Sequence, residues 1–263
     1  MLKREFKVNF KSFVIYLSIL IIMFLFVYII YPYIVTDDAL KSMDEMMKTL
    51  PPEMLKAFNI DIAEIDTAYG WLKTEGFMFV LIVIGIFSAM LGSNIVLKEE
   101  NDKTIEYLGT MPITRNRILT NKVLVSIIYI ILIVLSLGLF NYVSLLLSGD
   151  FDKMQFILLS ITPLFAALPL FAINLFISMF MHKTRKTIAI SFGMVFIFYI
   201  LNVLSELSTK VEFIKYFSLY TLCDIRNVIT KVSINPITII IGLIITITFI
   251  SLSYIRYNKK ELI

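Results

Sequence analysis

The sequence predicts an all-α membrane protein with six transmembrane helices. The first indication is composition: 59% of the 263 residues are hydrophobic, only 17% are charged, and the mean hydropathy is +0.87. Soluble domains are only about 45–50% apolar. The second is arrangement, because the apolar residues stand in blocks of the roughly 20 residues that a membrane-spanning helix needs. The third is that basic residues gather in the short segments between alternate blocks.

Six apolar segments are predicted to span the membrane, at about residues 13–35, 76–97, 123–148, 154–181, 187–206 and 235–254. The first is too long for the hydrophobic region of a signal peptide, and we expect it to be retained. Pro163 and Pro169 lie inside the fourth, where two missing backbone donors predict a kink or a break. We expect residues 1–263 to form a single transmembrane domain.

Three segments outside these spans also carry expectations. Residues 1–12 alternate basic and apolar side chains, which predicts a short amphipathic helix on the inner membrane surface, with an ordinary basic flank as the alternative. Residues 36–75 form the longest polar interval, and a helix beginning at Pro51 and Pro52 is expected on the outer surface. Residues 208–234 hold an apolar patch too short to span, which predicts a re-entrant or interfacial element before the last helix.

The basic residues orient the bundle. If the N terminus is inside, four Lys and Arg precede the first span, five lie in segment 98–122, three in 183–186 and three in the C-terminal tail, of 24 in the chain. Cytoplasmic loops carry the excess of Lys and Arg in membrane proteins. We therefore predict that both termini are cytoplasmic and that segment 98–122 faces the cytoplasm.

The composition argues against several kinds of site. Cys223 is the single cysteine and His182 the single histidine, so neither a disulfide within the chain nor a zinc site of the usual ligands can form. No Gly-x-x-x-x-Gly-Lys-Ser/Thr loop is present to bind ATP. Glu99-Glu100 invites comparison with membrane proteases that carry Glu-Glu-x-x-x-Arg, but Thr104 stands at the arginine position and the histidines are missing. We expect no catalytic residue, cofactor or metal in this chain.

Segment 98–122 resembles a motif of ABC-2-type transporter permeases. That motif is Glu-Glu-x-x-Gly-Thr-Ile/Leu-Glu-x-Leu-Leu-x-x-Pro-Ile-Ser/Thr-Arg, followed by a lysine before the next span. Here it extends from Glu99 to Arg115 and closes with Lys122, while Lys103 replaces the usual glycine and Gly109 the second leucine. Residues 52–58 with 75–77, and residues 215–219, are similar to other parts of these permeases. The resemblance covers most of the chain.

The resemblance implies an ABC-2, type V exporter-like architecture in the bacterial plasma membrane, surrounded by lipid and without a nucleic-acid partner. Two permease subunits, identical or related, would pair with two cytoplasmic ATPase subunits that carry ATP and Mg²⁺. The chain itself would not be an enzyme but would couple hydrolysis in its partner to export of a substrate. The alternatives are an immunity or resistance pump that removes a peptide antibiotic from the membrane, and a secondary transporter.

The residues assigned to coupling lie in this motif and are Glu99, Glu100, Thr104, Ile105, Glu106, Leu108, Pro112 and Arg115. Ile105 and Leu108 are three residues apart, so on a helix they could insert together into an apolar groove of a partner. Pro112 ends that helix, and Thr114 can cap the next one. A short helix joined directly to two spans could pass a push to both. The alternative is a solvated loop without a partner.

Asparagines inside the spans are the candidates for a transport pathway. Asn94, Asn174 and Asn202 are assigned to it because polar residues at membrane depth often mark substrate routes. The alternative, which also applies to Asn141, is a hydrogen bond between helices, worth about 0.6 kcal/mol on average.

Overall fold

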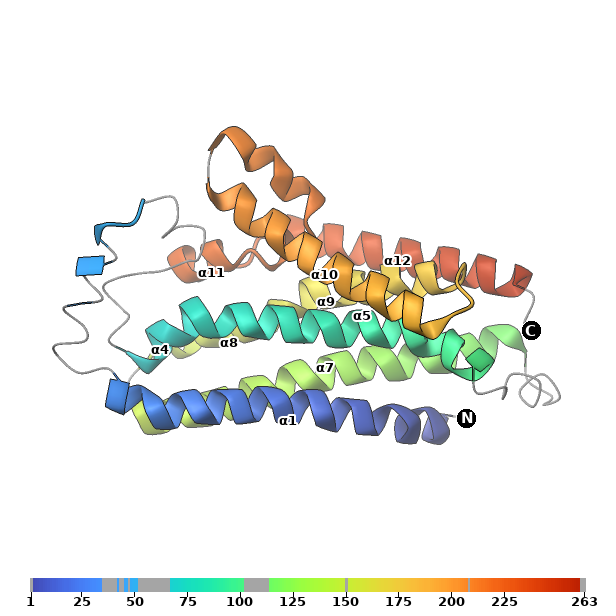
Figure 1. Ribbon diagram of the computed structural model, residues 1–263, viewed down its shortest axis with the longest axis horizontal. Helices are drawn as coiled ribbons and strands as arrows, with labels where there is room; N and C mark the ends of the chain where they lie inside the picture. Colours follow the sequence, from blue (N-terminus) through green and yellow to red (C-terminus); the bar gives the residue numbers. More distant parts are fainter. Residues whose placement is uncertain are drawn as a thin grey trace.

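The structure is a computed structural model that describes residues 2–34, 42, 45, 46, 48–51, 67–101, 114–149, 151–207 and 209–260. Within these ranges every regular element is a helix. Six helical segments are long and apolar enough to cross a membrane. They run alternately in opposite directions along one elongated bundle, so that the first helix starts and the last helix ends at the same end of it (Figure 1). We call this the terminal end and the opposite one the distal end.

The first helix, α1 (Leu2–Ile34), includes the basic N-terminal residues. The short amphipathic helix expected there is therefore not a separate element but the opening turns of α1. One reason is that no proline or glycine interrupts residues 2–31. Another is a contact with α7 (Arg115–Ser148), where the hydroxyl of Tyr129 donates a hydrogen bond to the carbonyl of Phe6 at 2.6 Å. This contact holds the N-terminal turns against the bundle.

The second span is preceded by two short helical pieces that lead into it without a break. α4 (Ala68–Trp71) begins at Thr67, whose side chain accepts a hydrogen bond from the N–H of Gly70 at 2.9 Å. A π-helical turn, η1 (Leu72–Gly76), then joins α5 (Phe77–Asn101). α5 ends beyond the predicted span and carries Glu99 and Glu100 in its last turn. The helix expected from Pro51 to Phe58 lies, apart from Pro51, outside the described residues.

The third span, α7, has the start that the sequence predicts. The hydroxyl of Thr114 accepts a hydrogen bond from the N–H of Arg117 at 3.4 Å, which confirms the expected N-terminal cap. The helix ends at Gly149, where a φ of 147° is accessible to glycine at little cost. The middle of segment 98–122, residues 102–113, lies outside the described residues.

The fourth span is interrupted at Thr162, as Pro163 predicts, whereas Pro169 lies inside α9 without ending that helix. α8 (Lys153–Ile161) and α9 (Pro163–Ser178) meet at Thr162. Pro163 stands at the first position of α9, where a helix needs no N–H donor. The carbonyl of Leu159, which would have paired with that missing donor, instead accepts a hydrogen bond from the hydroxyl of Thr162 at 2.8 Å.

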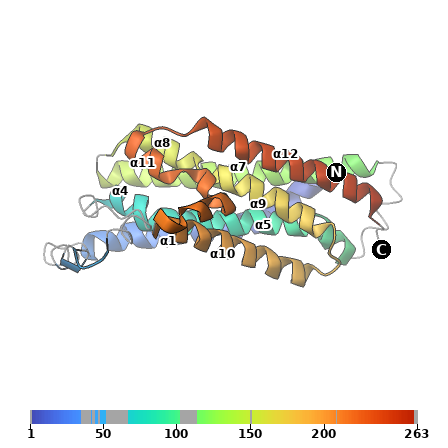
Figure 2. The ribbon, with the colours of Figure 1, turned by 90° about the horizontal axis from the view of Figure 1, so that it is seen from above.

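After α10 (Thr184–Leu207) the chain folds back at the distal end (Figure 1, Figure 2). A 3₁₀ helix, η2 (Thr209–Phe217), runs beside α10, and a shorter one, η3 (Leu219–Cys223), and α11 (Ile225–Lys231) follow. The last span is α12 (Pro236–Lys259). The hydroxyl of Tyr220 donates to the carbonyl of Leu81 in α5 at 3.2 Å, which anchors η3 on the bundle. None of the three short helices is long enough to cross, in agreement with the re-entrant element that the sequence predicts. We call residues 209–231 the re-entrant element.

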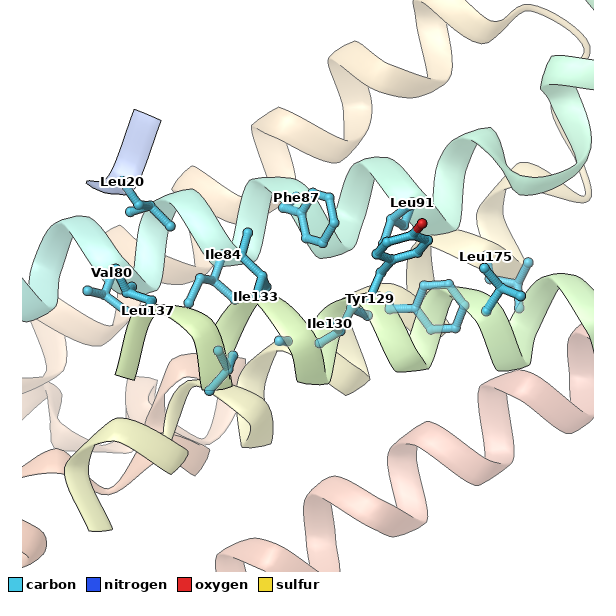
Figure 3. Close-up of a cluster of buried hydrophobic side chains, with 14 of the residues drawn as sticks. Leu20, Val80, Ile84, Phe87, Leu91, Tyr129, Ile130, Ile133, Leu137 and Leu175 are labelled. Atoms are coloured by element: carbon cyan, nitrogen blue, oxygen red, sulfur yellow. The ribbon is translucent and has the colours of Figure 1, made fainter. Parts of the chain in front are cut away.

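α5 lies at the centre of the bundle. In its apolar stretch 72% of the residues are buried, against 11% in α1 and 17% in both α10 and α12. Figure 3 shows one side of α5 packed against α7, through Val80, Ile84, Phe87 and Leu91 facing Tyr129, Ile130, Ile133 and Leu137. α9 approaches so closely that a Cβ on Gly92 would overlap the carbonyl oxygen of Phe171. The less buried helices leave apolar faces for lipid.

Candidate functional site

The predicted coupling residues divide into two groups. Glu99 and Glu100 are in the last turn of α5, and Arg115 is the first residue of α7. Both ends of segment 98–122 therefore lie at the terminal end of the bundle, where the structure describes their side chains. The remaining coupling residues lie outside the described residues: Thr104, Ile105, Glu106, Leu108 and Pro112.

Four charged side chains from three helices form an ion cluster at the start of segment 98–122. The ammonium of Lys122 on α7 lies 2.9 Å from the carboxylate of Glu99 on α5 and 3.2 Å from that of Glu5 on α1. The guanidinium of Arg4 is 3.6 Å from Glu99. Lys122, Glu99 and Glu5 are buried, with exposures of 4%, 6% and 3%. We call Arg4, Glu5, Glu99 and Lys122 the inner ion cluster.

The inner ion cluster is balanced in charge, with two carboxylates against two cations. A buried charge loses its hydration and is tolerated only with good partners, so removing one member typically costs about 3–5 kcal/mol. Glu99 thus holds α5 to α1 and α7, and its side chain is directed into the protein. Arg4, with 40% of its side chain exposed, is the member that reaches the surface.

A second ion pair joins the end of α5 to the end of α12. The ammonium of Lys260 lies 2.7 Å from a carboxylate oxygen of Glu100, close enough for an ion pair but without hydrogen-bond alignment. It also donates a hydrogen bond to the carbonyl of Met181, just after α9, at 3.1 Å. Arg115 donates to the carbonyl of Lys260 at 2.9 Å. One lysine thus connects α5, α7, α12 and the turn after α9.

Neutral polar contacts surround these ion pairs. The hydroxyls of Thr120 on α7 and Tyr254 on α12 are 2.7 Å apart, and Asn258 donates to Asn116 at 2.8 Å. The amide of Asn101 donates to the hydroxyl of Thr184, which ties α5 to the start of α10. The terminal end is therefore a polar layer that links all six spans, whereas the bundle above it is packed mainly through apolar side chains.

Sequence reasoning assigned Glu99, Glu100 and Arg115 to this region but missed their partners. Glu5 carried a signal, since it is the single acid in residues 1–36 and stands among basic residues. Lys122 was recognised as the lysine that closes the motif, without a partner. Lys260 was counted only as a basic residue of the tail, and nothing in its sequence neighbourhood points to Glu100.

The asparagines assigned to the pathway have different surroundings. Asn202 accepts a hydrogen bond from Thr221 at 3.2 Å, which joins α10 to η3. Asn174 is fully buried, and its amide donates to the carbonyl of Leu170 in its own helix at 2.8 Å. Asn94 and Asn174 each keep a buried side-chain oxygen without a hydrogen-bond partner among the described residues. Asn141 accepts from Tyr28 at 3.3 Å, a contact between α7 and α1. A pathway role for Asn94, Asn174 and Asn202 stays a prediction.

The fold and this polar end define a polytopic membrane protein whose spans are locked together on one side of the bilayer. A family model described as ABC-2 family transporter protein matches residues 1–262. The chain therefore belongs to the ABC-2 transporter family, which confirms the resemblance seen in the sequence. No curated protein and no solved structure gives a significant match.

Membership in this family assigns a general role. The chain is a multi-pass membrane protein and a permease subunit of an ABC transporter, so it contributes the membrane component of transport and not the catalysis. Permeases of this family associate with ABC ATPase subunits. The terminal end, with the two ends of segment 98–122, is the candidate site for that association.

Proposed function

We propose that this chain is the permease subunit of an ATP-driven exporter in the bacterial plasma membrane. The terminal end faces the cytoplasm, and segment 98–122 receives force from a separate ATPase that holds ATP and Mg²⁺. Two permease subunits, either two copies of this chain or this chain and a relative, pair with two ATPase subunits. The excess of Lys and Arg at the terminal end supports this orientation.

The observation that carries the proposal is the ion pairing at the two ends of segment 98–122. Glu99, just after the segment begins, and Lys122, where it ends, are 2.9 Å apart and buried. Glu5 connects the same lysine to α1, and Lys260 connects Glu100 to α12. Because the two ends are held to each other and to two more helices, a push on the segment moves four helix ends together. Packed helices held in this way respond by discrete shifts and not by local bending.

The test measures whether ATP hydrolysis by the partner at the terminal end changes the conformation of the distal end. The chain is purified with the ABC ATPase that copurifies with it and reconstituted in lipid vesicles. Cys223 is replaced by serine, and a cysteine placed at Lys231, an exposed residue of α11, is labelled with an environment-sensitive fluorophore. We expect ATP to change the fluorescence, and Glu100→Gln or Glu106→Gln to reduce that change while hydrolysis continues.

Glu212→Gln serves as the matched control, because Glu212 is exposed at the distal end and its ion pair among the described residues is with Lys215 of the same helix, η2. It should leave both hydrolysis and the fluorescence change as in the parent protein. A chain that purifies without any ATPase and moves cargo in an ion gradient alone would instead support a secondary transporter and overturn the proposal.

A further inference from the structure

A cavity of about 760 Å³ lies at the distal end, between the end of α10, the re-entrant element and the start of α12. Its volume falls in the range of about 300–1,000 Å³ that is typical of small-molecule sites. It lies at the opposite end of the bundle from the inner ion cluster and the Glu100–Lys260 pair. We call it the distal cavity.

The rim of the distal cavity carries charges of both signs. Arg226 on α11 lies 2.9 Å from Glu206 at the end of α10, and Lys215 lies 2.6 Å from Glu212 on η2. Asp224 accepts hydrogen bonds from the amide of Asn227 at 2.7 and 3.0 Å. The rim therefore holds three carboxylates and two cations. The side chains of Arg226 and Glu212 are 50% and 56% exposed, so a ligand can reach them.

The opposite wall of the cavity is apolar. Ile237, Ile241 and Ile245 line it at four-residue spacing on one face of α12, with Leu219 and Leu222 of η3 beside them. Ile245 is nine residues beyond Pro236, so the wall continues about 13 Å toward the middle of the bundle. Ile237 and Ile241 remain largely exposed, so this wall is continuous with the lipid-facing side of α12.

This arrangement selects an amphiphile. The charged rim lies at the helix ends, where lipid head groups are found, and the apolar wall extends along the hydrocarbon layer. A purely anionic head group would meet more carboxylates than cations. A head group with both an ammonium and a phosphate can satisfy both kinds of rim charge, and charge-assisted hydrogen bonds are the strongest available for this.

We propose that the distal cavity binds one zwitterionic phospholipid of the adjoining leaflet, of the phosphatidylethanolamine type. Its ammonium is held by the carboxylates of Asp224 and Glu206, and its phosphate by Arg226 and Lys215. One acyl chain follows Ile237, Ile241 and Ile245 along α12. The site does not depend on coupling to an ATPase.

The test uses the purified full-length chain in a non-ionic detergent, titrated with dioctanoyl phosphatidylethanolamine and, in parallel, dioctanoyl phosphatidylglycerol. Native mass spectrometry counts the bound lipid. We expect one phosphatidylethanolamine per chain and about tenfold weaker binding of phosphatidylglycerol. Arg226→Gln should weaken the first lipid about tenfold, the effect of losing one charge-assisted contact. Ile241→Trp should strongly weaken binding, because the larger side chain obstructs the path of the acyl chain along α12.

Two matched controls separate the cavity from the general surface. Lys231→Gln removes an exposed charge from the same helix as Arg226, and Ile240→Trp enlarges an exposed residue next to Ile241 that does not line the cavity. Both should bind like the parent chain. Equal binding of the two lipids would overturn the proposal, and so would equal losses of lipid binding in Ile240→Trp and Ile241→Trp. A dimer of the chain that carries no lipid would overturn it as well. Since the tryptophan variants do not alter the rim, they test the site even if Arg226→Gln unfolds.

Discussion

The ammonium of Lys122 on α7 lies 2.9 Å from the carboxylate of Glu99 on α5, and both side chains are buried. α5 ends two residues after Glu99, at Asn101, and α7 begins at Arg115, seven residues before Lys122. This ion pair therefore holds together α5 and α7, the two helices that segment 98–122 connects. Its charges are matched by Glu5 and Arg4 of α1, so the N-terminal turns of α1 belong to the same unit.

Lys122→Met should strongly destabilise the protein. The substitution keeps most of the side-chain volume but leaves Glu5 and Glu99 buried with Arg4 as their remaining cation within the inner ion cluster. We expect the free energy of unfolding to fall by about 3–5 kcal/mol, the usual cost of removing one partner of a buried ion pair. The measurement is the thermal exposure of Cys223, followed with a thiol-reactive fluorophore on the purified chain.

Lys98→Met provides the control for that experiment, because Lys98 is an exposed lysine in the same turn of α5 as Glu99. It should change the transition by little. Adding Glu99→Gln to Lys122→Met should recover part of the lost stability, since one uncompensated charge disappears. If both lysine variants unfold at the temperature of the parent chain, Lys122 does not hold the bundle together.

Cys223 should resist thiol reagents in the folded protein. It lies on η3, outside the six spanning helices, and is fully buried. Burial raises the pKa of its thiol to about 12. Only the thiolate attacks a maleimide, so labelling at pH 8 should be slow in the native chain and fast after denaturation in SDS. Mass spectrometry of the labelled chain measures both rates.

The pH dependence of labelling follows from the direction of that shift. Between pH 7 and 9 the native rate should stay low, whereas the denatured rate should rise as an ordinary thiol ionises near pH 8.5. Because the folded pKa is raised, the neutral thiol contributes to stability below its unfolded pKa, and that contribution is lost as the pH rises toward 12. Rapid native labelling at pH 7 would show that η3 does not pack against α9 and α12 as described.

Gly92→Ala should separate α5 from α9. A Cβ at this position would overlap the carbonyl oxygen of Phe171 and lie 2.9 Å from the backbone nitrogen of Leu175, and backbone atoms cannot move aside as a side chain can. We expect a loss of about 1–3 kcal/mol, as for other overpacked sites. Gly193→Ala in α10 is the control: nothing lies within 4 Å of its Cβ position, and alanine favours a helix by about 0.5–1 kcal/mol. Thermal unfolding should therefore shift in opposite directions, and equal shifts would contradict this helix contact.

Much of the fold follows from local features of the sequence. The spans are long apolar blocks, and the break at Pro163 and the cap at Thr114 each depend on a single residue type in a known position. The amphipathic helix expected at the N terminus was wrong as a separate element, because the sequence pattern cannot show that Glu5 and Phe6 find partners on α7. Those contacts favour one continuous helix.

The candidate site is less predictable for the same reason. Glu99 and Glu100 stand next to each other, yet Glu99 pairs with Lys122 and Glu100 with Lys260, 160 positions away. Which lysine meets which acid depends on how the helices are arranged around α5, and a loop motif contains no information about that. Asn202 illustrates the point, since its partner Thr221 is brought to it by the fold-back of the re-entrant element.

The docking of the re-entrant element on α5 can be tested through Gly85 and Tyr220. A Cβ on Gly85 would overlap the hydroxyl oxygen of Tyr220 but would still be 3.3 Å from the ring carbon that bears it. Gly85→Ala should therefore destabilise the chain, and Tyr220→Phe alone should cost about 1 kcal/mol through loss of the hydrogen bond to Leu81. In the double variant the clash is absent, so its total loss should be smaller than the sum of the single losses by at least about 1 kcal/mol. Gly193→Ala combined with Tyr220→Phe should be additive, because Gly193 has no neighbour there. Strict additivity of the Gly85 and Tyr220 losses would mean that η3 does not rest on α5 at this glycine.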